Sequence, residues 1–303
     1  MTKRNSIPVL EVGGTHVTAA LVDNATCMVQ RNSLVHMLLS ADGTADELVH
    51  GLVAAANTLG SDHSDVWSIA IPGPFDYENG IGLFEHVGKF DSLLGMNLRS
   101  ALVAGIRPTP ADVHFLNDAD AFGIGEYAIG AARGYDRVIC ITLGTGVGSA
   151  FLVRGEPVKS GPLVPLDGSV HRLDYRGRPL EDTVSSRAIR KAYASFGEID
   201  GNRGPDVHDI AERSRRGDEA AGQVLQEAFE NLGMALGPVV ECFNPSVLVV
   251  GGSIARSWDI VKPSIRTGLI RAVPSLDALI MKPAEHAGDA AISGAAYWVR
   301  QRE

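Results

Sequence analysis

Cysteine, aromatic residues and positive charge are all scarce in this chain of 303 residues, in which only 6% of the side chains are aromatic. The three cysteines, Cys27, Cys140 and Cys242, are far apart and form no Cys-x-x-Cys pair, which argues against a disulfide framework, a thiolate zinc site and a dithiol redox centre. Lysine and arginine number 27 against 36 aspartates and glutamates, and this net charge of −9 argues against an extended nucleic-acid surface. These scarcities favour a protein of a reducing compartment.

Long hydrophobic runs are also missing, since no segment approaches the about 20 apolar residues of a membrane-spanning helix. The N-terminus passes from two basic residues directly into Ile7–Leu10, without the apolar region or cleavage site of a secretory signal. We therefore expect a cytoplasmic protein with no membrane partner. Cys140 and Cys242 lie in apolar runs, so we expect both to be buried.

Strand and helix patterns alternate along the chain, which indicates an α/β architecture. The length favours about two domains. Because no low-complexity linker is present, we place the boundary inside structured chain. We expect an N-terminal α/β domain over residues 1–117 and a C-terminal α/β domain over 118–289, with a final helix at about 290–303 that packs back onto the first domain.

Two glycine-rich segments resemble each other, residues 12–22 (VGGTHVTAALV) and residues 143–153 (LGTGVGSAFLV). Each predicts a β-hairpin. A single turn of this kind usually only reverses a strand, but glycine lets backbone N–H groups surround an anion, and threonine adds a hydroxyl donor. Two copies favour phosphate binding by Gly13, Gly14 and Thr15 in the first turn and by Gly144, Thr145 and Gly146 in the second.

The remaining hydrophobic patterns predict further elements. The strand over residues 66–71 ends at Pro72–Pro74, which forces a loop at the edge of the sheet where ligands bind in α/β proteins. Residues 163–180 are irregular and polar, as in a loop. We expect other strands over 113–116, 137–143 and 247–250, and helices over about 45–59, 119–129 and 290–300 and from Ser185, Val207 and Asp218.

Asp118 follows a predicted strand and begins a predicted helix, with Asn117 beside it. Both residue types are common helix N-caps. In the functional interpretation, Asp118 is a general base that takes the proton of a substrate hydroxyl, while Asn117 forms hydrogen bonds with neighbouring hydroxyls. Both interpretations stay open at this point.

Two further segments each allow a structural and a functional interpretation. Glu11 lies at the end of the first buried strand, where a carboxylate is unfavourable unless it is paired, hydrogen-bonded or near a metal. It either holds a water-coordinated Mg²⁺ or caps its own glycine turn. Gly251, Gly252 and Ser253 follow a hydrophobic strand, where bare backbone either receives a nucleoside or permits tight packing.

Taken in order, these residues resemble the ROK family (repressor, open reading frame, kinase) of sugar kinases, within the actin-like ATPase superfamily. The resemblance covers nearly the whole chain. It implies a two-domain actin-like ATPase (ribonuclease H-like) fold with an interdomain cleft, an ATP-dependent kinase activity and a homodimer. The segments that carry it are 11–15 (EVGGT), 71–74 (IPGP), 116–121 (LNDADA), 142–148 (TLGTGVG), 180–186 (LEDTVSS), 244–253 (NPSVLVVGGS) and 291–296 (AISGAA).

The resemblance also implies roles for single residues. Asp118 corresponds to the catalytic base, Asn117 and Glu181 to residues that bind substrate hydroxyls, and Gly73 to the sugar-side loop. On the donor side, the resemblance implies that Gly144 and Thr145 hold the phosphates of ATP and that Gly251 and Gly252 face the nucleoside.

The departures from the family pattern lie mostly on the acceptor side. Glu11 stands where the family usually has aspartate. The cysteine-rich zinc motif is absent, so we expect no structural zinc. The Glu-x-Gly-His stretch has no clean counterpart, and Asp167 and His171 are the candidate substitutes. Lys89 replaces part of an asparagine–leucine pair near the sugar, where it binds a hydroxyl or an existing charge, or lies on the surface.

We therefore expect a kinase that uses ATP and Mg²⁺ to phosphorylate a hydroxyl of a hexose or a related polyol, a cyclitol included. Polyphosphate is an alternative donor, because some family members without the zinc motif use it. The alternative function is a regulatory or non-catalytic sugar-binding protein. Family repressors add an N-terminal DNA-binding domain, for which we expect no room before Ile7, and the retention of Asn117, Asp118 and both turns argues against a non-catalytic module.

Overall fold

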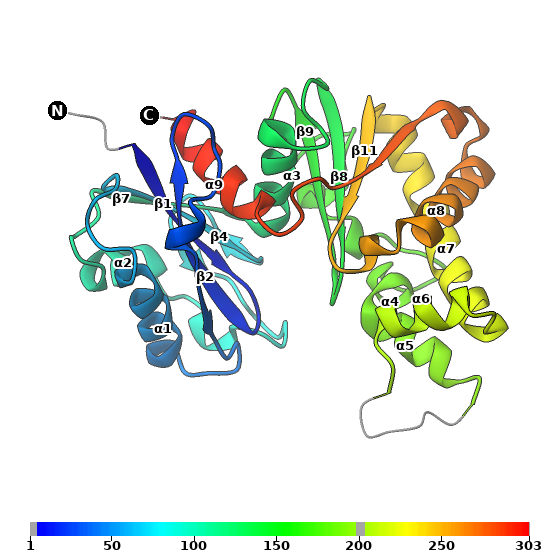
Figure 1. Ribbon diagram of the computed structural model, residues 1–303, viewed down its shortest axis with the longest axis horizontal. Helices are drawn as coiled ribbons and strands as arrows, with labels where there is room; N and C mark the ends of the chain where they lie inside the picture. Colours follow the sequence, from blue (N-terminus) through cyan, green and yellow to red (C-terminus); the bar gives the residue numbers. More distant parts are fainter. Residues whose placement is uncertain (1–4, 198–203, 303) are drawn as a thin grey trace. The chain divides into compact units, whose positions relative to one another are not determined.

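Two compact units make up the chain, and each contains one five-stranded β-sheet with helices packed against it (Figure 1). The computed structural model describes residues 5–197 and 204–302. The first unit comprises Met1–Arg133 and His286–Glu303, and the second comprises Gly134–Glu285. The mixed α/β class that the sequence predicts is confirmed.

The two units repeat one topology. In each sheet, two strands form an antiparallel hairpin, a third pairs antiparallel beside the second, and the last two run parallel to the first. The order is β3-β2-β1-β4-β7 in the first sheet and β10-β9-β8-β11-β12 in the second. The two glycine-rich segments are therefore equivalent hairpins that begin equivalent sheets.

The bounds of the elements follow from the structure. The first unit contains β1 (Ser6–Val12), β2 (His16–Asp23), β3 (Val35–Leu38), α1 (Ala45–Asn57), β4 (Val66–Ile71), β5 (Phe75–Asp76), β6 (Ile81–Gly82), α2 (Leu98–Gly105), β7 (Asp112–Asn117), α3 (Asp118–Ile129) and α9 (Ala290–Arg300). The second contains β8 (Arg137–Leu143), β9 (Val147–Val153), β10 (Glu156–Pro157), α4 (Glu181–Val184), α5 (Ser186–Ala194), α6 (Val207–Arg215), α7 (Glu219–Phe243), β11 (Val247–Gly251), α8 (Trp258–Ala272) and β12 (Ile280–Pro283).

Helices cover both faces of the first sheet. Trp67 and Ile69 of β4 share an apolar cluster with Leu48 of α1. Ser68 points to the opposite face, because side chains alternate along a strand, and its Oγ donates a hydrogen bond to the backbone oxygen of Ala295 in α9 at 2.8 Å. The last helix thus returns to the first unit.

Helices α3 and α9 approach each other closely because glycine occupies the contact on both. A Cβ added at Gly125 would lie 1.9 Å from the carbonyl oxygen of Ala290, and one added at Gly294 would lie 1.8 Å from that of Ala121. This packing keeps α3 in the first unit. The contacts therefore divide the chain after Arg133, whereas the sequence led us to expect a boundary after residue 117.

A buried carboxylate joins the two segments at which the chain leaves and re-enters the first unit. Glu126 in α3 has no exposed surface. Its Oε2 accepts a hydrogen bond from the backbone N–H of Ala131, and its Oε1 accepts one from that of His286, both at 2.8 Å. The start of the segment into α9 is therefore fixed directly against the end of α3.

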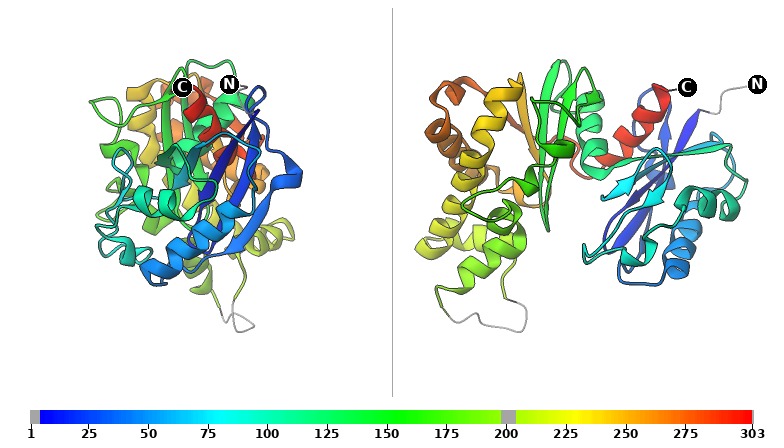
Figure 2. Two further views of the ribbon diagram at one scale, coloured as in Figure 1. Left: turned by 90° about the vertical axis from the view of Figure 1, so that its left-hand side faces the viewer. Right: turned by 180° about the vertical axis from the view of Figure 1, so that it is seen from behind.

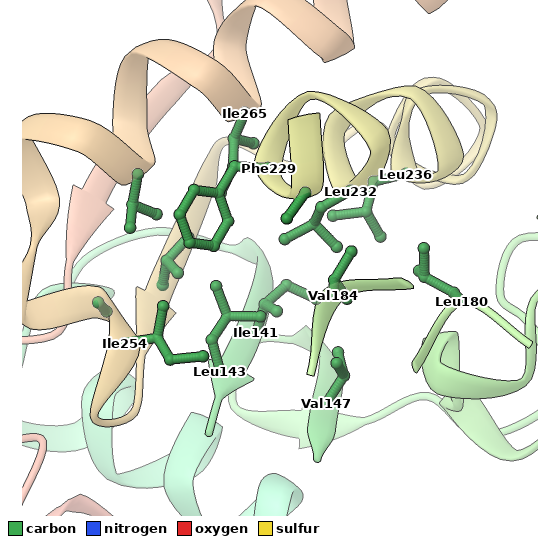
Figure 3. Packing of buried hydrophobic residues seen from close by; sticks show 14 of the residues in the cluster. Ile141, Leu143, Val147, Leu180, Val184, Phe229, Leu232, Leu236, Ile254 and Ile265 are labelled. Atoms are coloured by element: carbon green, nitrogen blue, oxygen red, sulfur yellow. The ribbon is translucent and has the colours of Figure 1, made fainter. Parts of the chain in front are cut away.

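Helices α7 and α8 lie along one face of the second sheet, in yellow and orange in Figure 2. Phe229 and Ile265 from these helices pack with Ile141 of β8 (Figure 3). Glycines again permit a close crossing, since a Cβ at Gly233 would lie 2.2 Å from the carbonyl oxygen of Ile265, and one at Gly268 would lie 2.0 Å from that of Glu230.

Most of the predicted elements are confirmed, including both hairpins, β4, β7, β8, β11, α1, α3, α7 and α9. The expected burial is confirmed for Cys140 and wrong for Cys242, which is exposed because α7 turns that position away from the core between Val240 and Phe243. Within residues 5–197 and 204–302, no helix combines the length and apolar character needed to cross a membrane.

Candidate active site

The first glycine turn connects β1 and β2 and is open on one side. Val12 pairs with Val17, and the N–H of Gly13 donates to the carbonyl oxygen of His16 at 2.8 Å. A Cβ at Gly13 would approach the His16 ring to 3.1 Å, whereas one at Gly14 would meet no atom within 4 Å. Nothing in the surrounding protein therefore requires glycine at position 14, and bare backbone there suits the close approach of an anion.

The second glycine turn connects β8 and β9 and rests on a dense core. Leu143 pairs with Val147, and the N–H of Gly144 donates to the carbonyl oxygen of Gly146 at 3.0 Å. Figure 3 shows Leu143 and Val147 pointing into the apolar cluster of the second unit. Ser186, at the start of α5, donates from both its backbone N–H (2.9 Å) and its Oγ (2.7 Å) to the carbonyl oxygen of Gly144.

Glu181 lies against this second turn. Its Oε2 accepts a hydrogen bond from the backbone N–H of Val147 at 3.0 Å, and a Cβ added at Gly146 would lie only 2.7 Å from the same oxygen. Leu180 and Val184, on either side of it in the sequence, are buried in the core shown in Figure 3. The carboxylate is thus held beside the turn by its neighbours on both sides.

The turn after β11 packs on the same hairpin. Gly252 has a φ of +86°, and a Cβ there would lie 2.2 Å from the carbonyl oxygen of Leu143. The atom nearest to a Cβ at Gly144 would be Ser253 Oγ, at 3.7 Å. Tight packing therefore explains the glycine at position 252, and it brings the Gly251–Ser253 segment beside the second turn.

Asn117, rather than Asp118, caps helix α3. Its Oδ1 accepts hydrogen bonds from the N–H groups of Ala119 at 3.0 Å and Asp120 at 3.3 Å. Asp118 occupies the first helical position, half-buried, and its Oδ1 accepts a hydrogen bond from the N–H of Ala119 at 2.9 Å. The field at a helix N-terminus stabilises a carboxylate there.

Three carboxylates of the first unit act on one another. Burial, together with the smaller effects of the charges of Asp118 and Asp289, raises the pKa of Glu11 to about 7. Asp289 precedes α9, is nearly buried, and forms a bidentate ion pair with the exposed Arg31. Segments far apart in the sequence thus contribute negative charge to one region.

This region fits a hydrated Mg²⁺. A cation near Glu11 would offset both the burial of its carboxylate and the repulsion from Asp118 and Asp289, which together raise its pKa. Mg²⁺ typically takes one or two carboxylates together with water and phosphate oxygens. Among the residues that the structure describes, no three His, Cys, Asp or Glu side chains converge to bind a metal by themselves. The protein would therefore supply only part of the coordination.

The loop that contains Lys89 is connected to the first turn through hydrogen bonds. The N–H of Phe90 donates to the carbonyl oxygen of Ala41 at 2.8 Å, and the N–H of Ala41 donates to that of Gly14 at 3.2 Å. Phe90 is buried while Lys89 is half-buried. Gly73, in the loop after β4, lies beside the Tyr77 hydroxyl.

Asp167 and His171 belong to a loop that packs on β9. Ser149 Oγ donates to the carbonyl oxygen of Gly168 at 2.5 Å and accepts from the N–H of Val170 at 3.0 Å. Asp167 is exposed with a left-handed φ of 55°, and His171 is half-buried. Asp167 and His171 therefore lie on one loop, anchored to β9 through Ser149.

Sequence reasoning missed two side chains of these sites, Tyr77 and Asp289. Tyr77 directly follows the two-residue strand β5, and no sequence spacing predicts that its hydroxyl accepts a hydrogen bond from Asn117. Asp289 directly precedes the last predicted helix. An acidic residue at the start of a helix was therefore the one feature of the sequence that could have drawn attention to it.

Comparisons with known proteins identify the family of this chain. The sequence model of the ROK family matches residues 8–162 and 175–302. The chain belongs to the ROK family. It is 25% identical to a glucokinase of Thermotoga maritima over 97% of this chain and 96% of that protein. It is 23% identical to an N-acetylmannosamine kinase of Haemophilus influenzae, over 96% of this chain and 94% of that protein.

A solved structure of the same family matches the whole architecture. It is a ROK family glucokinase of Streptomyces griseus in complex with glucose and AMPPNP, 26% identical, with a TM-score of 0.73 over 98% of this chain and 99% of that one. The fold is therefore the two-domain fold of the ROK kinases, as the sequence predicts.

Proposed function

We propose that this ROK protein is a kinase that uses ATP and Mg²⁺ to phosphorylate a hydroxyl of a hexose or a related polyol, a cyclitol included. One observation carries the proposal. Asn117 takes the cap position of α3, so the carboxylate of Asp118 stands at the first helical position beside it, in the region of Glu11. A carboxylate next to a side-chain amide suits a general base beside a hydroxyl-binding group.

In the proposed reaction, an Asp118 carboxylate oxygen takes the proton of the acceptor hydroxyl as the hydroxyl oxygen attacks the γ-phosphorus. The bond from that phosphorus to the bridging oxygen of ATP breaks, and ADP leaves with the electron pair. The backbone N–H groups of the glycine turns stabilise the charge on the phosphate oxygens. Mg²⁺, when bound near Glu11, neutralises part of that charge.

The donor side of the proposal uses both hairpins. Gly13, Gly14 and Thr15 belong to one turn and Gly144, Thr145 and Gly146 to the other. The openness around Gly14 supports this assignment, because an exposed glycine without a packing reason leaves backbone accessible. Gly251, Gly252 and Ser253 are assigned to the nucleoside, and the contact of this segment with the second turn supports that role.

The acceptor side includes Asn117, Glu181 and Gly73, with Lys89, Asp167 and His171 as further candidates. The relatives named for glucose and N-acetylmannosamine support a hexose. The altered acceptor residues favour a substrate other than plain glucose. A homodimer, as the resemblance implies, belongs to the same proposal, and sedimentation velocity tests it.

A coupled ADP-release assay with ATP and Mg²⁺ tests the proposal on hexoses, amino-hexoses, N-acetylmannosamine and cyclitols. Asp118→Asn should lower kcat about 10²- to 10⁴-fold, the usual contribution of a general base, while the free energy of unfolding changes by at most about 1 kcal/mol. The exposed Asp62→Asn is the matched control. Polyphosphate replaces ATP in a parallel series. Binding of a sugar without turnover from either donor would instead identify a sensor, and full activity of Asp118→Asn would exclude Asp118 as the base.

A further inference from the structure

The hydroxyl of Tyr77 lies between the carboxyl ends of two neighbouring parallel strands. Strands β4 and β7 pair Ile71 with Asn117. Asn117 Nδ2 donates a hydrogen bond to the Tyr77 hydroxyl at 3.1 Å, and this hydroxyl lies 3.4 Å from the carbonyl oxygen of Ile71, to which it donates. One phenol therefore links the ends of both strands.

The Tyr77 ring is held by aromatic packing. Its centroid lies 5.4 Å from that of Phe75, which in turn packs against Phe84 and Phe115 at centroid distances of 6.2 and 5.0 Å. Gly73 leaves room for the hydroxyl, because a Cβ there would lie 3.1 Å from it. The position of the hydroxyl is thus fixed by the apolar core of the first unit.

The Asn117 carboxamide is consequently oriented at both ends. Its Oδ1 is used as the cap of α3, where it accepts from two backbone N–H groups. Its Nδ2 carries two hydrogens, and Tyr77 accepts one of them. Within residues 5–197 and 204–302, Tyr77 is the partner of Nδ2, so the second N–H is left to recognise a substrate. The amide therefore offers that substrate a donor rather than an acceptor.

We propose that Tyr77 is a positioning residue that orients the Asn117 amide, so that its second Nδ2–H donates to one hydroxyl of the acceptor. The inference rests on the proposed function, because it assigns Asn117 to the acceptor. It also defines a chemical requirement. The acceptor atom opposite Asn117 carries a lone pair, so a hydroxyl oxygen is recognised there and a protonated amine is rejected.

Tyr77→Phe tests this role, because it removes the hydroxyl and keeps the ring. We expect the KM for the acceptor, glucose or N-acetylmannosamine, to rise about three- to tenfold, the effect of one net hydrogen bond, while the KM for ATP stays unchanged. Tyr193→Phe is the matched control. It also removes a partly buried tyrosine hydroxyl, which in the second unit donates a hydrogen bond to the carboxylate of Asp218. A merely structural role would lower Tm and raise both KM values together.

Monodeoxy analogues of the preferred acceptor locate the hydroxyl concerned. In the wild type, removal of that hydroxyl raises KM, and in Tyr77→Phe the same removal has a smaller effect, because the oriented donor is already lost. Equal effects of every deoxygenation in the two proteins would show that Tyr77 does not act through Asn117 on the acceptor.

A measurement on the ligand-free protein separates this inference from the proposed function. In ¹⁵N-labelled protein, the side-chain amide of Asn117, assigned by its loss in Asn117→Asp, should show one proton protected from solvent exchange, and the protection should vanish in Tyr77→Phe. Absence of protection in the wild type overturns the positioning role. If the Asn117 proton is protected but no acceptor is turned over, the proposed function is refuted while the orientation of the amide is supported. If an acceptor is turned over and its KM is unchanged in Tyr77→Phe, only the positioning role of Tyr77 is refuted.

Discussion

Glu181 Oε2 accepts a hydrogen bond from the backbone N–H of Val147, 3.0 Å away, so the second glycine turn has a carboxylate attached to it. The same turn is proposed to bind phosphate, which a negative charge repels, so the position of this carboxylate is better explained if it also serves another partner. An acceptor hydroxyl that donates to the other lone pairs of Glu181 is such a partner, since an ionised carboxylate accepts about four hydrogen bonds.

Glu181→Gln should separate these two contacts. The glutamine oxygen retains the bond to Val147, so we expect an unchanged Tm, while the loss of charge weakens the bond to the acceptor hydroxyl and raises the acceptor KM about tenfold. Glu181→Ala loses both contacts and should also lower the free energy of unfolding by about 1 kcal/mol. Steady-state kinetics and urea unfolding of the two variants measure the difference. Identical behaviour of the two variants would contradict a dual role.

The sequence allows much of the fold to be predicted because its signals are local. The two hairpins follow from glycine turns between apolar runs, and α3 follows from the Asn117–Asp118 start. Helices α2 and α8 were not predicted, and in α8 Pro263 interrupts the helical signal although Val261, Ile265 and Leu269 recur every four residues. The division after Arg133 depends on the contact between Gly125 of α3 and Gly294 of α9, which are so far apart in the sequence that they give no local signal.

Some residues of the candidate site can likewise be predicted from the sequence, and others cannot. Glu11, Asp118 and both turns stand out because each combines a strand end with an unusual residue type. Tyr77 and Asp289 do not, because their relation to Asn117 and Glu11 arises only when separate segments meet. The sequence also left the cap of α3 open between Asn117 and Asp118, and only the hydrogen bonds of the Asn117 side chain decide it.

Gly14→Ala should impair the use of ATP without harming the fold. A Cβ at this position meets no atom within 4 Å, and the loss of backbone freedom in the unfolded chain should stabilise the protein by a few tenths of a kcal/mol to about 1 kcal/mol. We expect a higher KM for ATP or a lower kcat, because the methyl group occupies the space proposed for phosphate. Thermal unfolding and kinetics measure both effects. Gly197→Ala, where a Cβ also meets no atom within 4 Å, is the control, and equal activity of the two variants would remove the first turn from the donor site.

Glu11→Gln should change how stability depends on pH. Burial and two neighbouring carboxylates raise the pKa of Glu11 from 4.5 to about 7, so the folded state binds a proton that the unfolded state releases between these values. Stability contributed by this group is present below pH 4.5 and falls as the pH rises to 7. The neutral glutamine avoids this loss, so the variant should be more stable than the wild type above pH 7, by at most on the order of 3 kcal/mol.

Tm measured from pH 4.5 to 8.5 checks this expectation, with the exposed Glu227→Gln as the control. The two stability curves of wild type and Glu11→Gln should converge toward pH 4.5. Addition of Mg²⁺ at pH 8 should raise the Tm of the wild type more than that of Glu11→Gln, because a cation relieves the repulsion between the carboxylates. A parallel pH dependence in the two proteins would show that Glu11 titrates normally.

Glu126→Gln should destabilise the first unit without touching the proposed chemistry. Both carboxylate oxygens accept backbone N–H groups, from Ala131 and His286, in a fully buried position. A glutamine offers one acceptor and places an NH₂ group opposite a backbone N–H, so one buried donor loses its partner, at about 1–3 kcal/mol. Urea unfolding should show this loss, and hydrogen exchange should show that protection falls more at the amides of Ala131 and His286 than at those within α3. Unchanged protection at both amides would mean that Glu126 does not fix the segment that leads into α9.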